Sequence, residues 1–216
     1  MFIAGDIKIF KTTDGGSTWV NLSPGGITRI YYQIYFLTPQ IGMVLGIVAN
    51  TGPMIIRTTN GCSSWSQQSF YDYEGVNNFQ FVNDSIGYFT SSIRKTVPDQ
   101  PDENILLETK NKGLNWTVKA KCPFRIGSCQ FINNDTIYIV IPPLGSGRTV
   151  FGSDSLRNHI MKSTDGGTTW QDQNAKFYFY SQPYAFPAMT LNTIRFNKVN
   201  KGLTVGSLDY NSCVIY

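Results

Sequence analysis

The sequence predicts an all-β protein on three grounds: its composition, its short alternating segments and an internal repeat. Aromatic residues make up 14% of the chain and charged residues 15%, and there are 20 glycines. This composition favours strands and tight turns over helices. The nonapeptide KTTDGGSTW at residues 11–19 returns as KSTDGGTTW at residues 162–170. Such a return indicates that one structural unit is copied along the chain.

Two degraded copies lie between these two nonapeptides, RTTNGCSSW at 57–65 and ETKNKGLNW at 108–116. Their final tryptophans are separated by 46, 51 and 54 residues. A second signature alternates with the nonapeptides along the chain. In it a short apolar alternation ends at Phe, and six residues later comes Gly, or Ile in one copy. The four pairs are Phe36/Gly42, Phe81/Gly87, Phe131/Ile137 and Phe196/Gly202. The unit is therefore a Phe strand, a turn, two further strands, the nonapeptide and a fourth strand. Four strands per roughly 50 residues are typical of a propeller blade.

The residue types within each nonapeptide fit a tight hairpin turn. A hydroxyl at the second position and a carboxylate or amide at the fourth can bond the turn amides, and glycines supply positive φ. The tryptophan can bury about 150–250 Å² between its own blade and the next. The residues to which we assign this structural role are Thr12, Asp14, Gly16, Trp19, Thr58, Asn60, Trp65, Thr109, Asn111, Gly113, Trp116, Ser163, Asp165, Gly167 and Trp170.

The nonapeptides resemble the Asp-box, or bacterial neuraminidase repeat, of pattern S/T-x-D-x-G-x-T-W. Sialidases, xyloglucanases and sortilin-type receptors share it, and the F-x5-G signature ahead of the box makes the chain most similar to photosystem II assembly and stability factor-like proteins. The resemblance implies a β-propeller whose boxes lie on the face opposite the substrate site. We therefore interpret Asp14 and Asp165 as structural, not as catalytic or calcium-binding residues.

Aligned copies indicate where blades begin and end. We expect one propeller domain over 1–216, with blades at about 1–25, 26–72, 73–122 and 123–178 and part of a fifth at 190–216. The strands at the two ends duplicate one another, which favours four blades plus part of a fifth, cut from a larger ring. A five-bladed ring is the alternative, and the exposed face of a part-ring would favour self-association or contact with further blades.

The loops opposite the nonapeptides are the expected binding face. The longest lie within 92–104, 142–158 and 174–190, and the last of these is rich in Tyr and Phe. Outward aromatic side chains can form a platform for a peptide or a sugar. The candidate binding residues are Arg94, Asp102, Arg148, Arg157, Tyr178, Tyr180 and Tyr184.

Catalytic patterns are weak in this chain. A sialidase-like site needs three arginines, a tyrosine nucleophile and acidic partners, and no Arg-Ile-Pro precedes the first nonapeptide. His159 is the only histidine and no C-x-x-C occurs, so we expect no metal site and no cofactor. Cys122 and Cys129 bracket a turn-like segment and can form a disulfide in an oxidising compartment.

Charge and hydropathy narrow the class of partner. The formal net charge of +4 is spread along the chain without a basic block, and no apolar run is long enough to span a membrane, so neither nucleic acid nor a membrane is an expected partner. We therefore expect a non-catalytic interaction or scaffold module of an exported, periplasmic or cell-surface protein, with a protein or glycan ligand. The alternative is a carbohydrate-active propeller, either a glycan-binding module or a sialidase- or xyloglucanase-like glycoside hydrolase.

Overall fold

A computed structural model of the protein describes residues 1–5, 7–25, 29–48, 51–94, 103–142, 158–173, 189–198, 201–208 and 212–215. Every regular element in these ranges is a β-strand, which confirms the predicted all-β class. No described segment forms a helix with the length and apolar character that a membrane crossing requires.

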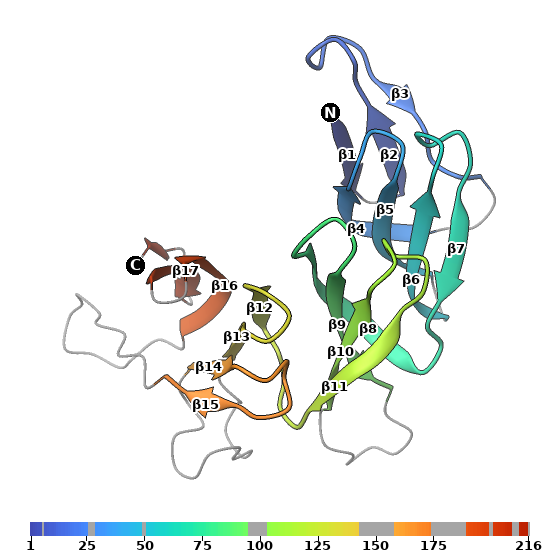
Figure 1. Ribbon diagram of the computed structural model, residues 1–216. Helices are drawn as coiled ribbons and strands as arrows, with labels where there is room; N and C mark the ends of the chain where they lie inside the picture. The colour runs from blue at the N-terminus through green and yellow to red at the C-terminus, as the bar shows by residue number, and fades with distance from the viewer. Residues whose placement is uncertain are drawn as a thin grey trace. The chain divides into compact units, whose positions relative to one another are not determined.

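The strands form five sheets, in which neighbours in the sequence are also neighbours in the sheet (Figure 1). The first and fifth sheets have three strands each: β1 (Phe2–Gly5), β2 (Lys8–Lys11) and β3 (Val20–Asn21), then β16 (Met189–Lys198), β17 (Lys201–Leu208) and β18 (Ser212–Ile215). The second has four: β4 (Arg29–Phe36), β5 (Gly42–Val48), β6 (Gly52–Thr58) and β7 (Ser66–Ser69).

The third and fourth sheets repeat the four-stranded plan of the second. They consist of β8 (Tyr73–Phe81), β9 (Gly87–Ile93), β10 (Asn104–Thr109) and β11 (Thr117–Cys122), then β12 (Ser128–Phe131), β13 (Ile137–Ile141), β14 (His159–Ser163) and β15 (Gln171–Asp172). The predicted order of Phe strand, two further strands, nonapeptide turn and fourth strand is therefore confirmed in three successive sheets.

Burial explains the composition of the strands. The middle strands β5, β10 and β13 are buried along nearly their whole length, because both of their faces are covered. β5 and β13 read as continuous apolar runs, and β10 has the apolar stretch Ile-Leu-Leu at its centre. The last strands, such as β3 and β7, are largely exposed and polar. The second, third and fourth sheets thus grade from a buried middle to a more solvated outer strand.

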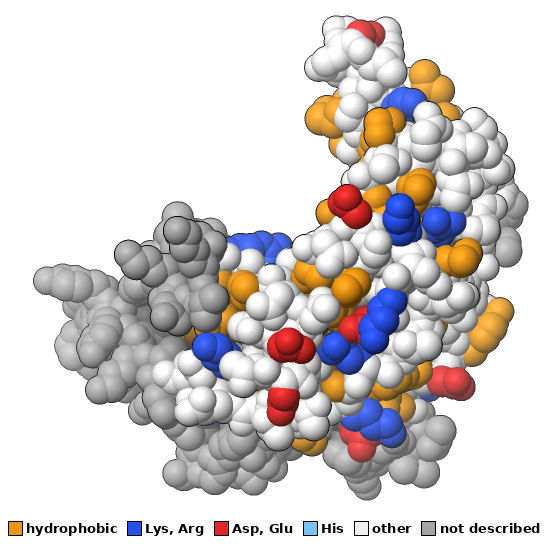
Figure 2. Space-filling view, viewed as in Figure 1, with side chains coloured by type: hydrophobic (Ala, Val, Ile, Leu, Met, Phe, Trp, Pro, Cys, Tyr) orange, Lys and Arg blue, Asp and Glu red, His pale blue; other side chains and the backbone are white. Residues whose placement is uncertain are grey.

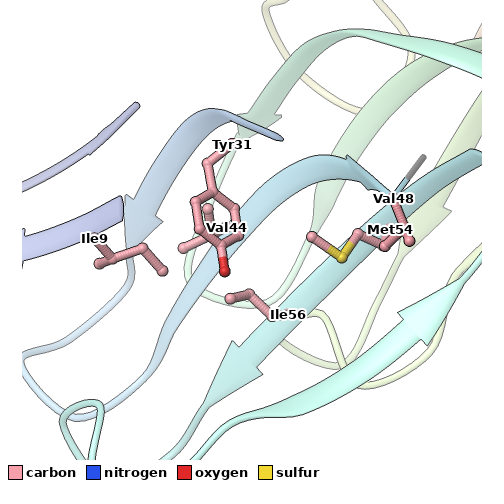
Figure 3. Packing of buried hydrophobic residues seen from close by; sticks show 6 residues of the cluster. All are labelled: Ile9, Tyr31, Val44, Val48, Met54 and Ile56. Carbon is pink, nitrogen blue, oxygen red and sulfur yellow. The ribbon is translucent and has the colours of Figure 1, made fainter. Parts of the chain in front are cut away.

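The chain divides into two compact units, residues 1–100 with 107–118 and residues 101–106 with 119–216. In the first unit a core forms where the first and second sheets face each other (Figure 3). Ile9 of β2 packs there with buried residues of the second sheet, namely Tyr31, Val44, Val48, Met54 and Ile56. Ala4, Ile34 and Trp65 extend this core.

The second unit has a core of the same kind between its fourth and fifth sheets. Tyr138, Val140 and Ile160 of the fourth sheet pack with Ile194 of β16. The rings of Tyr138 and Phe196 stack with centroids 3.8 Å apart. Face-to-face packing of consecutive sheets is therefore the common principle of both units.

Candidate functional site

The four nonapeptides form four turns with one shared hydrogen-bond network; they are termed the first (11–19), second (57–65), third (108–116) and fourth (162–170) turns. The hydroxyl of the second residue donates to the side-chain oxygen of the fourth and accepts the N–H of the sixth. In the first turn Thr12 Oγ1 lies 2.7 Å from Asp14 Oδ1 and 2.9 Å from Gly16 N. Thr58, Thr109 and Ser163 make the same two bonds in the other turns.

The side-chain oxygen at the fourth position also accepts the N–H of the eighth residue, at 2.9 to 3.0 Å in all four turns. In the first and fourth turns the second carboxylate oxygen of the Asp also accepts a hydrogen bond from a hydroxyl, that of Thr18 or Thr169, each at 2.6 Å. The Thr169 hydroxyl, then the backbone N–H of that residue, lowers the pKa of Asp165 to about 2, and the corresponding bonds lower that of Asp14. Both carboxylates are thus bound to their own turns.

The predicted positive φ is present in every turn. Gly15 and Gly16 have φ of 71° and 101°. In the degraded copies non-glycine residues adopt this conformation, Cys62 with φ of 77° and Lys112 with φ of 60°. Because a Cβ disfavours this region, the second and third turns carry backbone strain that the first and fourth avoid.

Each later turn is also tied to the loop that joins the first two strands of its own sheet. The N–H of the fifth turn residue donates to a backbone oxygen of that loop: Gly61 to Gln40 at 3.0 Å, Lys112 to Ser85 at 3.0 Å and Gly166 to Asp135 at 2.9 Å. The turns and these loops therefore lie at the same end of the strands of their sheets.

The four tryptophans differ in burial. Trp65 donates from Nε1 to Leu22 O at 3.0 Å, so it reaches the preceding sheet and not the next one as expected. Trp116 is 6% exposed and contacts the rings of Phe79, Phe81 and Phe89. Trp19 is 37% exposed, so the tryptophan of the first turn is covered less than that of the third.

Of the residues predicted for the opposite face, Arg94 is the one that the structure describes. Asp102, Arg148, Arg157, Tyr178, Tyr180 and Tyr184 lie outside the described residues. Arg94 follows β9 at the end away from the 82–86 loop, so it lies opposite the turns as predicted.

Arg94 sits in a corner between the second and third sheets, which we term the Arg94 corner (Gly52, 70–73 and Arg94). The backbone N–H of Arg94 donates to Asp72 O at 3.0 Å, and the side-chain Nη2 lies 3.5 Å from Tyr73 O. A Cβ on Gly52 would lie 2.8 Å from Tyr73 O and 3.1 Å from Nη2, so glycine permits this close approach. The buried Nε of Arg94 has no hydrogen-bond partner among the described residues.

The 70–73 segment of the Arg94 corner is rich in aromatic residues. The rings of Phe70 and Tyr73 stack with centroids 6.4 Å apart, and Tyr71 is 64% exposed. Burial, then the charge of Asp72, raises the pKa of Tyr73. The Arg94 corner therefore combines a fixed guanidinium with one outward tyrosine. Elsewhere on the surface, Figure 2 shows Lys and Arg side chains interspersed with acidic ones.

The predicted disulfide is not formed in the structure. Cys122 and Cys129 are buried thiols, and burial raises the pKa of both, that of Cys122 to about 12. They lie in the apolar interior at the end of β11 and within β12, where an unionised thiol packs as a small apolar group. His159, expected to be structural, has its Nδ1 2.7 Å from Asp172 Oδ2 on the adjacent strand β15.

Two glutamines that the sequence pattern did not single out link consecutive sheets. Gln33 Nε2 donates to Phe79 O at 2.7 Å, and Phe79 N–H donates to Gln33 Oε1 at 3.2 Å. Gln130 makes the same pair of bonds with the backbone of Phe196. Each side-chain amide thus bonds both the N–H and the C=O of one backbone residue in the next sheet, as a neighbouring strand would. Gln33 lies three residues before Phe36 and Gln130 lies directly before Phe131, so no fixed spacing in the sequence marks this role.

Comparisons with known proteins bear on the fold. No protein-family model matches the sequence, and no curated protein matches it. Among solved structures, the chain is similar to an α-L-arabinanase of Penicillium chrysogenum complexed with arabinobiose, with 14% identity over 97% of this chain and 69% of that one and a TM-score of 0.50. An ancestral GH74 enzyme gives 14% identity over 94% of this chain and 28% of that one, also with a TM-score of 0.50.

The protein has a β-propeller fold. YCF48 from Cyanidioschyzon merolae is a further similar structure, with 16% identity over 96% of this chain and 74% of that one and a TM-score of 0.47. At these identities the likeness shows the fold alone. The five sheets are therefore propeller blades. The function of this propeller follows from its own residues and not from the likeness.

Proposed function

We propose that this propeller is a non-catalytic interaction module whose contact surface lies opposite the turns and includes the Arg94 corner. The observation that carries the proposal is the exposed Tyr71, whose neighbour in sequence, Asp72, accepts the backbone N–H of Arg94 at 3.0 Å. Tyrosine and arginine are enriched among the residues that dominate binding energy at protein interfaces. The backbone of Arg94 is bonded to Asp72 O and its Nη2 lies 3.5 Å from Tyr73 O, so part of its conformational freedom is already restricted before a partner arrives, which reduces the entropy lost on binding.

The hydrogen bonds within the turns, on the face opposite the proposed contact surface, also support this proposal. The carboxylates of Asp14 and Asp165 accept hydrogen bonds from three groups of their own turn, which suits a structural Asp-box. A general acid or nucleophile needs a carboxylate that can reach a substrate and exchange a proton near the working pH. We propose accordingly that the four turns stabilise the blades of an exported, periplasmic or surface protein.

A carbohydrate-active propeller is the second candidate, favoured by the aromatic character of the same corner. Tyr71 is exposed and Tyr73 is half-buried, so their rings could stack on a sugar as well as on a peptide. Such a protein would bind a glycan there, or hydrolyse it with carboxylates on the same face.

The test compares the protein with Tyr71→Ala and with Gln67→Ala, a control on the exposed part of β7. Each protein is immobilised for partner capture from the source cells, probed with a glycan array, and incubated with a panel of polysaccharides whose new reducing ends are measured. The proposal expects a protein partner that Tyr71→Ala loses and Gln67→Ala keeps. Release of reducing ends, or glycan binding lost with Tyr71→Ala, would support the second candidate and overturn the first.

A further inference from the structure

The second turn contains Asn60 followed by Gly61, the single Asn-Gly pair in the chain. Asn60 stands where the first and fourth turns have Asp14 and Asp165. Asn-Gly is the dipeptide most open to intramolecular attack on the side-chain amide, because glycine places no Cβ beside the attacking nitrogen. Asn60, which departs from the aspartate of the first and fourth turns, is thus a residue that deamidation can convert to aspartate.

We propose that Asn60 is a site of slow spontaneous deamidation that proceeds when the second turn opens, and that the aspartate product gives this turn the carboxylate cap of the first and fourth turns. The backbone nitrogen of Gly61 loses its proton and attacks Asn60 Cγ, and ammonia leaves as a five-membered succinimide closes. Water then opens the ring. One water is consumed and one ammonia is released, and the ring yields either aspartate or β-linked isoaspartate.

The closed turn opposes the first step. The Gly61 N–H is donated to Gln40 O at 3.0 Å, so this nitrogen is engaged and directed away from the side chain. Asn60 Oδ1 accepts Thr58 Oγ1–H and Ser64 N–H, each at 3.0 Å, and Nδ2 donates to Ser64 Oγ at 2.9 Å. The attacking nitrogen and Cγ can meet only after these bonds break, which places the reaction in a locally opened state.

The closed turn is also ready for an aspartate. The Ser64 hydroxyl occupies the position of Thr18, whose hydroxyl donates to Asp14 Oδ2 at 2.6 Å. After conversion this hydroxyl can rotate and donate to the new carboxylate oxygen, and the bonds from Thr58 and Ser64 N–H become charge-assisted and stronger. Isoaspartate has an additional backbone atom in the turn, so it cannot keep both the Thr58 bonds and the Gln40 bond.

The third turn is a matched internal control. Asn111 makes the same bonds to Thr109 and to the backbone of Asn115, and the next N–H, of Lys112, is donated to Ser85 O at 3.0 Å. The residue after Asn111 is lysine instead of glycine, which hinders ring closure. Asn115 also replaces the hydroxyl residue, so an aspartate at 111 would gain less than one at 60.

The first experiment ages the intact protein in mildly alkaline buffer, folded and in denaturant, and follows Asn60 and Asn111 by peptide mapping with mass spectrometry. We expect conversion at Asn60 ahead of Asn111 in both states, and faster conversion at Asn60 in denaturant than in the folded protein. Equal rates at the two asparagines, or equal rates at Asn60 with and without denaturant, would overturn the gated site.

The second experiment measures the product directly with Asn60→Asp, Asn60→Ala and Asn111→Asp. Replacement of the neutral bond between Asn60 Nδ2 and Ser64 Oγ by a charge-assisted one predicts a rise of roughly 2–4 °C in the melting midpoint for Asn60→Asp in a chain of this size. Asn111→Asp should rise less, and Asn60→Ala should fall because it loses the cap. A midpoint for Asn60→Asp at or below that of the unmodified protein would refute the restored cap, whatever the deamidation rates are.

Discussion

The ring of Phe36 lies so close over Gly42 that no Cβ fits between them. The two residues are paired across β4 and β5, and a Cβ on Gly42 would lie 2.4 Å from Phe36 Cε1. The opposite side of the ring stacks on Phe2, with centroids 3.7 Å apart. Phe81 covers Gly87 in the same way at 2.8 Å. The F-x5-G signature is therefore a cross-strand pair in which the aromatic ring fills the space left by a missing side chain.

This relationship predicts the effect of adding one methyl group. Gly42→Ala should destabilise the protein by about 1–3 kcal/mol, since the ring held between Phe2 and residue 42 must move. Gly5→Ala is the matched control, because a Cβ there meets nothing within 4 Å. Urea unfolding of the two variants measures the difference, and equal midpoints would contradict the pairing.

The tryptophans of the turns should differ in what their removal costs. Trp116→Ala should cost about 3–5 kcal/mol, because it empties a site among three phenylalanine rings. Trp19→Ala should cost clearly less, because that side chain is 37% exposed. Trp116→Phe is a milder control, since Nε1 of Trp116 has no partner among the described residues. Equal losses for the two alanine variants would show that burial is not what sets them.

Local networks were predictable from the sequence and long-range ones were not. Each turn is encoded within nine residues, so the Asp14 contacts and the positive φ of Gly15 and Gly16 followed from residue type alone. The exposure of Trp19 depends on which sheet faces it, a property of neighbours that the nonapeptide does not carry. Gln33 bonds a residue 46 positions away, and no local pattern specifies that partner.

The binding face shows the same limit. The sequence predicts Arg94 at the binding face because it lies in a long loop opposite the turns, but its side-chain contacts are with Gly52 and Tyr73 on other strands. Tyr71 was not among the candidates, because a single tyrosine in a short connection carries no repeat signature. Its exposure follows from the end of β7 turning toward β8, and tertiary structure alone reveals that.

The fourth turn should give the protein a specific response to acid. The pKa of Asp165 is lowered from 3.8 to about 2 in the folded state, first by the Thr169 hydroxyl. A carboxylate whose folded pKa is depressed stabilises the protein above its unfolded pKa, and this contribution is lost as pH falls from about 4 toward 2. Asp165→Asn should flatten the loss of stability in this window, and Thr169→Val should flatten it partly. Thermal melts across the window test this, and unchanged pH dependence in both variants would contradict it.

The amide of Gln33 should contribute to the joint between the second and third sheets. Gln33→Leu removes both hydrogen bonds to the backbone of Phe79, a residue that is 2% exposed, so its N–H and C=O are left without these partners. Such a loss should cost about 1–3 kcal/mol per unsatisfied group. Gln33→Glu is the matched control, because its carboxylate still accepts the Phe79 N–H but cannot donate to the carbonyl. Hydrogen exchange at Phe79 should accelerate strongly in Gln33→Leu and less in Gln33→Glu. If neither variant changes exchange at Phe79, the second and third sheets are joined by packing of the Tyr35 ring on Phe79 and Phe81 and not by the glutamine amide.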